Sequence, residues 1–96
     1  MRVFFSHRLI RRIGPFGEGF VLKADVYEWL IQNVGWGSSE SVKRPAAQWY
    51  WYYGFDGKMI DCYSSDDLVP LEAIMPIIEF ENISHALLFK LTWGGL

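Results

Sequence analysis

The sequence predicts an α+β domain in which two helices pack on one face of an antiparallel sheet. Aromatic and β-branched residues alternate along several short runs, which is typical of strands. Two segments, 26–34 and 68–75, instead carry apolar residues at helical spacing. The pair Asp56-Gly57 separates two strand-like runs and favours a tight turn between them.

Length and composition indicate one folded domain over residues 1–96. The chain has 51% hydrophobic and 18% aromatic residues, which excludes a disordered protein. Because the aromatic share is so large, we expect some of the aromatic residues to lie on the surface. Contact with another protein, or with a second copy in a homodimer, would cover such residues.

The charges are divided unequally along the chain, although the net charge is only −2. Residues 1–48 contain seven basic and four acidic residues, whereas residues 49–96 contain two and seven. This pattern lacks the overall basic field that drives non-specific binding to nucleic acid.

The single cysteine, Cys62, cannot form an intramolecular disulfide, which fits a reducing compartment. Polar residues at 6–8 interrupt the apolar N-terminal run, so a secretory signal is not predicted. No apolar run approaches the roughly 20 residues of a membrane span. We therefore expect a cytoplasmic protein with no membrane partner.

Residues 1–13 are predicted to form the first strand, because β-branched and aromatic residues recur in this segment. It is also the most basic part of the chain. Such charges protect a solvated edge strand from pairing with other strands. Alternatively they bind phosphate or an acidic partner, and the candidate basic contacts are Arg8, Arg11 and Arg12.

A glycine-rich turn is predicted at 14–19, followed at 20–23 by a short strand or the lead-in to a helix. The helix itself is predicted to have Asp25 as its N-cap, with Glu28 completing a capping box. Gly35 is expected to end it.

The segment 36–47 is predicted to be a flexible loop, because small, polar and charged residues dominate it. It is long for a connection in so small a domain, and such loops are often functional. Lys43 and Arg44 lie near its end, just before an aromatic run.

The aromatic run at 49–53 is predicted to form a hairpin over residues 48–63, with its turn at Asp56-Gly57. Side chains alternate between the two faces of a strand. One face carries Trp49, Trp51, Tyr53, Ile60 and Cys62, and we expect it to meet the core. The other carries Gln48, Tyr50, Tyr52, Met59, Asp61 and Tyr63.

This second face of the hairpin is the predicted binding surface for a partner. Tyrosine supplies a large amphipathic contact area and is enriched at interfaces. The alternative is that a helix or the ends of the chain cover this face. The predicted partner-binding residues are Tyr50, Tyr52, Met59, Asp61, Tyr63, Lys43 and Arg44.

A second helix is predicted from a cap near Asp67 to Met75, with Pro76 ending it. A second hairpin is predicted to follow, with strands at 77–81 and 85–93. The run 86–91 is apolar on both faces apart from one lysine, which is typical of a central strand. The resulting order, β-α-β-β-α-β with one additional strand, is that of a ferredoxin-like fold.

The sequence contains no catalytic or metal-binding motif, so we predict a non-enzymatic protein without cofactor or metal. Cys62 falls on the core face of the hairpin, which predicts an inert thiol. His7 and His85 fall on separate predicted strands with apolar neighbours. The aspartates near residues 61–67 lack the spacing of a calcium loop, and helix capping accounts for two of them.

The predicted function is that of a small protein-interaction module, an inhibitor or adaptor that binds another protein or itself through the tyrosine-rich face. A phage- or mobile-element-encoded antagonist of a host protein would fit this description. The alternative is a domain that stacks the bases of single-stranded nucleic acid on the same tyrosines, with basic residues on the phosphates. The acidic C-terminal half works against this alternative.

Overall fold

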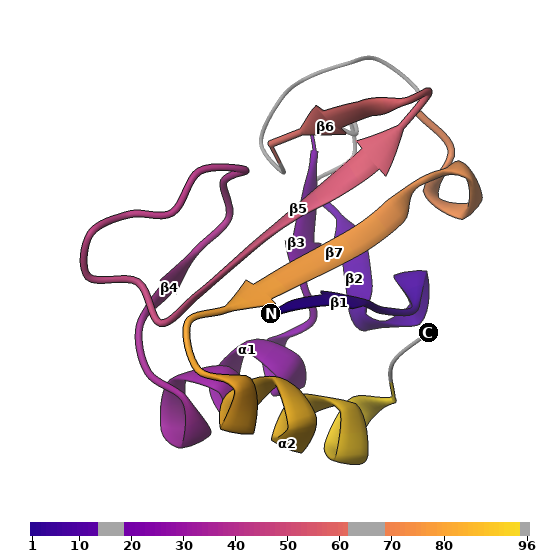
Figure 1. Ribbon diagram of the computed structural model, residues 1–96. Coiled ribbons are helices and arrows are strands. Elements are labelled where there is room, and N and C mark those ends of the chain that lie inside the picture. Colours follow the sequence, from indigo (N-terminus) through magenta and orange to yellow (C-terminus); the bar gives the residue numbers. More distant parts are fainter. Residues whose placement is uncertain (14–18, 62–68, 95–96) are drawn as a thin grey trace.

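The computed structural model describes residues 1–13, 19–61 and 69–94, and its longest strand is β5 (Trp49–Phe55) (Figure 1). This is the aromatic run that the sequence predicts as half of a hairpin. Strand β7 (Met75–Phe80) pairs antiparallel along most of β5. These two strands form the centre of the main sheet.

Three shorter strands complete the main sheet. Strand β1 (Arg2–Phe4) pairs antiparallel with β7, and β6 (Lys58–Ile60) pairs antiparallel with the end of β5. Strand β4 (Gly37–Ser38) pairs with the start of β5 in parallel. The sheet is therefore mixed, in the order β1-β7-β5-β4 with β6 also on β5, and not wholly antiparallel as predicted.

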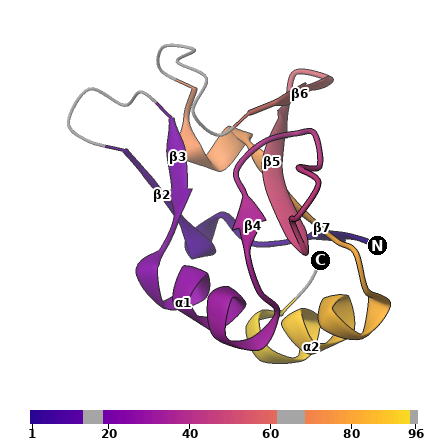
Figure 2. The same ribbon diagram turned by 90° about the vertical axis from the view of Figure 1, so that its left-hand side faces the viewer.

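A two-stranded sheet and two helices form the rest of the described molecule. Strands β2 (Ile10–Arg12) and β3 (Phe20–Leu22) pair antiparallel across the core from β5 and β7. Helices α1 (Ala24–Asn33) and α2 (Ile83–Trp93) lie side by side at one end (Figure 2). The predicted α+β class is confirmed, and two helices are present, although only α1 lies where the sequence predicts a helix.

The core is an aromatic network with Phe89 of α2 at its centre. The Phe89 ring contacts those of Phe5, Trp29 and Phe80 at centroid distances of 5.8, 6.1 and 5.5 Å. Such pairs contribute about 0.5–1.5 kcal/mol each beyond the burial of their area. The surrounding buried cluster contains Val3, Phe5, Ile10, Phe20, Leu22, Val26, Leu30, Trp49, Trp51, Tyr53, Val69, Ile74, Ile78, Phe80 and Ala86.

The predicted hairpin is confirmed over its described part. Asp56 and Gly57 form the two-residue turn with φ of 52° and 74°, the left-handed values that a tight hairpin turn requires. Phe55 therefore lies opposite Lys58. The predicted core face is also correct, because the three buried side chains Trp49, Trp51 and Tyr53 join the core cluster.

The single strand predicted over residues 1–13 is wrong, because the segment contributes to two sheets. A 3₁₀ turn (His7–Leu9) separates β1 from β2, and the Ser6 hydroxyl caps it by accepting a hydrogen bond from the Arg8 amide. The turn changes the alternation of side chains, so Ile10 is buried in place of its neighbours. Short-range hydrogen bonding by serine outweighs strand propensity here.

Helix α1 is confirmed, with a different start. Its N-cap is Lys23, whose side chain makes no capping bond, and Asp25 lies within the first turn. The Asp25 carboxylate accepts a hydrogen bond from the neighbouring Val26 amide instead. Gly35 follows the helix with φ of 133°, so the predicted stop is correct.

The helix predicted near 67–75 is wrong in the described part of that range. Residues 62–68 lie outside the described residues. The next element is a short 3₁₀ turn (Leu71–Ala73), and Met75 already begins β7. Pro76 explains this, because a proline disfavours helical backbone at the residue before it.

The strand predicted at 85–93 is also wrong, since this segment is helix α2. Asn82, predicted as part of a turn, is its N-cap and accepts a hydrogen bond from the Ser84 amide at 2.8 Å. Alanine and leucine have high helix propensity, and apolar residues on all sides suit a helix as well as a central strand. With this helix at the end, the described elements do not follow the predicted ferredoxin-like order.

Candidate interaction surface

The candidate site is the outer face, by which we mean the side of the main sheet that points away from the core. Neither α1 nor α2 lies over it (Figures 1 and 2). The pairing register places on it Arg2, Phe4, Ser38, Tyr50, Tyr52, Gly54, Met59, Met75, Ile77 and Glu79.

Tyr52 lies in the middle of the outer face but is only 1% exposed. Its ring stacks on that of Tyr50, with centroids 6.0 Å apart, and its hydroxyl donates a hydrogen bond to Glu79 Oε2 at 2.6 Å. Burial, together with this hydrogen bond and the charge of Glu79, raises the pKa of Tyr52 to about 12. Tyr52 therefore supports the sheet and does not present an open ring to a partner.

Tyr50 is half-buried and lies in an acidic environment. Burial raises its pKa, and the carboxylates of Glu79 and Glu81 add to that rise, while Arg2 opposes it. A phosphate placed beside the Tyr50 ring would face the same two carboxylates. The surroundings of the tyrosine pair therefore disfavour a polyanion.

A shallow hollow of about 330 Å³ lies at the end of the outer face, beside the β5–β6 turn. The turn residues 54–59 line one side of it, and Ala73, Met75 and Ile77 line the other. Met59 and Met75 are 55% and 53% exposed at its border. Methionine adapts to differently shaped apolar groups, which suits such a border to binding.

A second hollow of about 370 Å³ is lined by residues 5–8 and 74–76. Met75 lines both hollows, so the two hollows adjoin at this residue. We call the two hollows together the methionine surface.

Two cations at the methionine surface form no ion pair with any described residue: Lys58 at the first hollow and Arg8 at the second. On the sheet Arg2 lies 3.8 Å from Glu79, and in the segment 39–46 Lys43 lies 3.3 Å from Glu81, which follows β7. One carboxylate, that of Asp56, also lines the first hollow.

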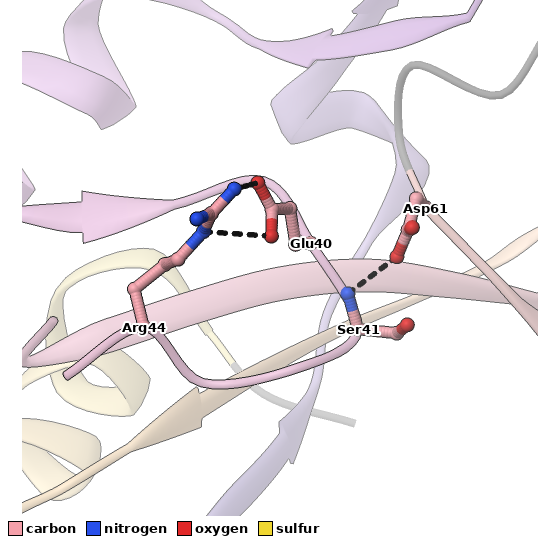
Figure 3. Close-up of polar contacts among 4 residues, drawn as sticks. All are labelled: Glu40, Ser41, Arg44 and Asp61. Atoms are coloured by element: carbon pink, nitrogen blue, oxygen red, sulfur yellow. Dashed lines mark hydrogen bonds and ion pairs between the residues drawn. The ribbon is translucent and has the colours of Figure 1, made fainter.

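Other predicted site residues hold the segment 39–46 in place (Figure 3). The Arg44 guanidinium makes two hydrogen bonds, of 2.9 and 2.6 Å, to the Glu40 carboxylate. The Asp61 carboxylate accepts a hydrogen bond from the Ser41 amide at 2.6 Å. Both Arg44 and Asp61 are therefore engaged within the chain, and the two predicted basic residues before β5 are already paired.

The N-terminal arginines do not gather at one place. Arg12 donates a hydrogen bond to the Val69 carbonyl at 2.6 Å, and its guanidinium lies 5.0 Å above the Phe20 ring. Arg11 is on the same strand, β2, across the core from the outer face (Figure 2). Only Arg8 of the three lines the methionine surface.

The structure thus brings Tyr50, Tyr52 and Met59 onto one face, as the sequence predicts. Tyr63 and Cys62 lie outside the described residues. The sequence interpretation missed Met75 and Ile77, which it assigned to a helix and to an unrelated hairpin. Pro76 was the signal for Met75, because the residue before a proline favours extended backbone.

The described residues offer little for other chemistry. They contain no group of three or more histidine, cysteine, aspartate or glutamate side chains placed to hold a metal ion. None of their helices has the length and apolar character needed to cross a membrane. Comparisons with protein-family models, with curated proteins and with solved structures found no match for this chain.

Proposed function

We propose that this protein is a small non-enzymatic interaction module, an inhibitor or adaptor that binds another protein through the methionine surface. The observation that carries the proposal is a pair of apolar hollows that share the half-exposed Met75, each lined by a cation, Lys58 or Arg8, that forms no ion pair with a described residue. The partner that fits is a protein segment with one or two large apolar side chains next to a carboxylate. Action as an antagonist of a host protein in the cytoplasm belongs to the same proposal and rests on small size and the single cysteine.

Apolar hollows with charged groups beside them are typical of protein–protein interfaces. Binding energy is concentrated in a few anchors that fill desolvated pockets, and polar groups at the rim add specificity. Met59 and Met75 can close around an apolar anchor because their side chains are flexible and half in solvent. Lys58 and Arg8 would then select a partner whose flanking residues are acidic.

Binding of single-stranded nucleic acid receives less support from the same geometry. Stacking needs open aromatic faces together with cations that follow the backbone. Here Tyr52 is buried, Tyr50 faces Glu79 and Glu81, and two of the candidate arginines lie elsewhere. Protein is therefore the proposed partner.

The test is an affinity capture from cells of the source organism, with and without nuclease, followed by binding of the purified partner. We expect a protein that survives nuclease treatment. Its affinity should fall at least tenfold, or about 1.4 kcal/mol, for the variant Met75→Glu. The fall arises because a carboxylate at residue 75 would enter an apolar contact and repel the partner's acidic flank.

The matched control is Val42→Glu, which adds the same charge at a side chain that is 70% exposed in the segment 39–46. It should bind like the natural chain. Equal loss in both variants would indicate a non-specific charge effect, and equal binding of both would place the interface elsewhere. Recovery of nucleic acid alone would favour the other function.

A further inference from the structure

Helix α2 buries one side in the core and exposes large apolar side chains on the other. Ala86 and Phe89 are fully buried. Four further residues of the helix are exposed by large fractions: Ile83 (61%), Leu87 (49%), Leu88 (40%) and Leu91 (85%). Helices that are apolar on all sides are normally covered all round, so this exposed stripe indicates a further contact.

The stripe has the symmetry that a second copy of the same chain requires. Ile83, Leu87 and Leu91 are four residues apart, so they lie along one side of the helix. If two copies of α2 run antiparallel across a two-fold axis at Leu87, Leu87 meets its own counterpart. Ile83 of each copy then meets Leu91 of the other, and the surface is self-complementary.

The stripe is large enough to form the apolar centre of a dimer interface, although not the whole of it. Its four side chains expose on the order of 400–500 Å² of apolar surface, the size of the largest patch on a typical monomer. A stable interface buries about 800 Å² from each partner, with an apolar centre and a polar rim. The exposed residues Ser84, Lys90 and Thr92 flank the stripe and would supply part of that rim.

The charge of α2 permits this pairing. Lys90 is its one Lys, Arg, Asp or Glu residue. In the antiparallel arrangement each Lys90 lies three residues beyond Leu87, the residue at the two-fold axis. The two Lys90 backbone positions are therefore about 9 Å apart along the direction of the helices. The antiparallel helix dipoles also attract each other weakly.

We propose that α2 is the interface of a homodimer in which two copies of the helix pack antiparallel, with Leu87 at the two-fold axis. The proposal is independent of the methionine surface. No residue of α2 lines either hollow, and the first hollow lies at the β5–β6 turn, at the end of the molecule away from the helices (Figures 1 and 2).

Sedimentation equilibrium of the purified chain over a wide dilution range tests the proposal. We expect twice the monomer mass at high concentration, and monomer for Leu87→Lys, which places two like charges at the axis. Val42→Lys is the control and should remain dimeric. A monomeric natural chain at all concentrations, or a dimer that survives Leu87→Lys with its fold intact by circular dichroism, would overturn the proposal.

A cysteine placed at Leu87 tests the register even if the lysine variant fails to fold. In a Cys62→Ser background, Leu87→Cys should form a disulfide-linked dimer under mild oxidation, because residue 87 of each copy meets at the axis. Val42→Cys in the same background should not. Equal cross-linking of both, or none at residue 87, would rule out this interface.

Discussion

The hydrogen bond between Tyr52 and Glu79 joins β5 to β7 on the outer face. Tyr52 is also the residue whose role changes most between sequence and structure. Alternation places it correctly on the outer face, but stacking and burial make it structural. A serine substitution at residue 52 would therefore lower the stability of the protein in addition to any effect on binding.

Tyr52→Phe should lower the free energy of unfolding at neutral pH by about 1.5–3 kcal/mol, the usual contribution of a hydrogen bond to a charged group. The phenyl ring keeps the stacking on Tyr50 while the bond to Glu79 is lost. Urea unfolding followed by tryptophan fluorescence measures the difference. Tyr27→Phe, at an exposed tyrosine of α1, is the control and should be close to neutral.

The raised pKa of Tyr52 also predicts a dependence of stability on alkaline pH. The folded-state pKa of about 12 lies above the value of about 10 in the unfolded chain. The contribution of Tyr52 is therefore complete below about pH 10 and is lost between about 10 and about 12. Over that window the natural chain should lose more stability than Tyr52→Phe, and parallel losses would contradict the assignment.

Strand β4 depends on a close approach between backbone and indole. The Trp49 ring lies across Gly37, so a Cβ at that position would be 2.1 Å from ring atoms. The Trp49 indole also donates a hydrogen bond to the Gly35 carbonyl at 2.8 Å. Glycine at 37 therefore determines that the chain leaving α1 can pair with β5.

Gly37→Ala should destabilise the protein by about 1–3 kcal/mol or more, the cost of overpacking a tight site. Gly54→Ala is the matched control, because a Cβ there has its nearest neighbours at 3.8 Å or beyond. Thermal and urea unfolding of both variants provide the comparison. A Gly37→Ala protein as stable as the control would show that the indole can move aside.

The molecule as a whole separates its candidate surfaces. The first hollow of the methionine surface lies beside the β5–β6 turn, α2 lies at the other end, and Arg11 and Arg12 lie on β2 (Figures 1 and 2). Binding to a partner and self-association should consequently be independent. Effects of changes that are far apart and share no neighbours usually add.

The same separation predicts weak binding of nucleic acid. Fluorescence anisotropy with a labelled single-stranded oligonucleotide should show no saturable binding near physiological salt. The reason is that the tyrosines and most of the cations do not share a surface, and that carboxylates surround Tyr50. Saturable binding that weakens steeply with added salt would contradict the expectation.

Local patterns in the sequence determined much of the central sheet. Alternation and the Asp56-Gly57 turn identified the hairpin, the face on which each side chain lies and the burial of Trp49, Trp51 and Tyr53, because these depend on nearest neighbours along the chain. The stop of α1 at Gly35 was determined in the same way. The same alternation places Tyr50, Tyr52 and Met59 on the outer face.

The tertiary structure alone decided the state of the C-terminal segment and the position of the exposed surfaces. The apolar segment 85–93 is compatible with both a central strand and a helix. Packing of Phe89 against Phe5, Trp29 and Phe80 selects the helix. Whether a tyrosine is open or buried depends on side chains from other strands, as the contact of Tyr52 with Glu79 shows. Met75 likewise joins the methionine surface because β7 brings it beside the β5–β6 turn, a relation between distant segments that no local pattern contains.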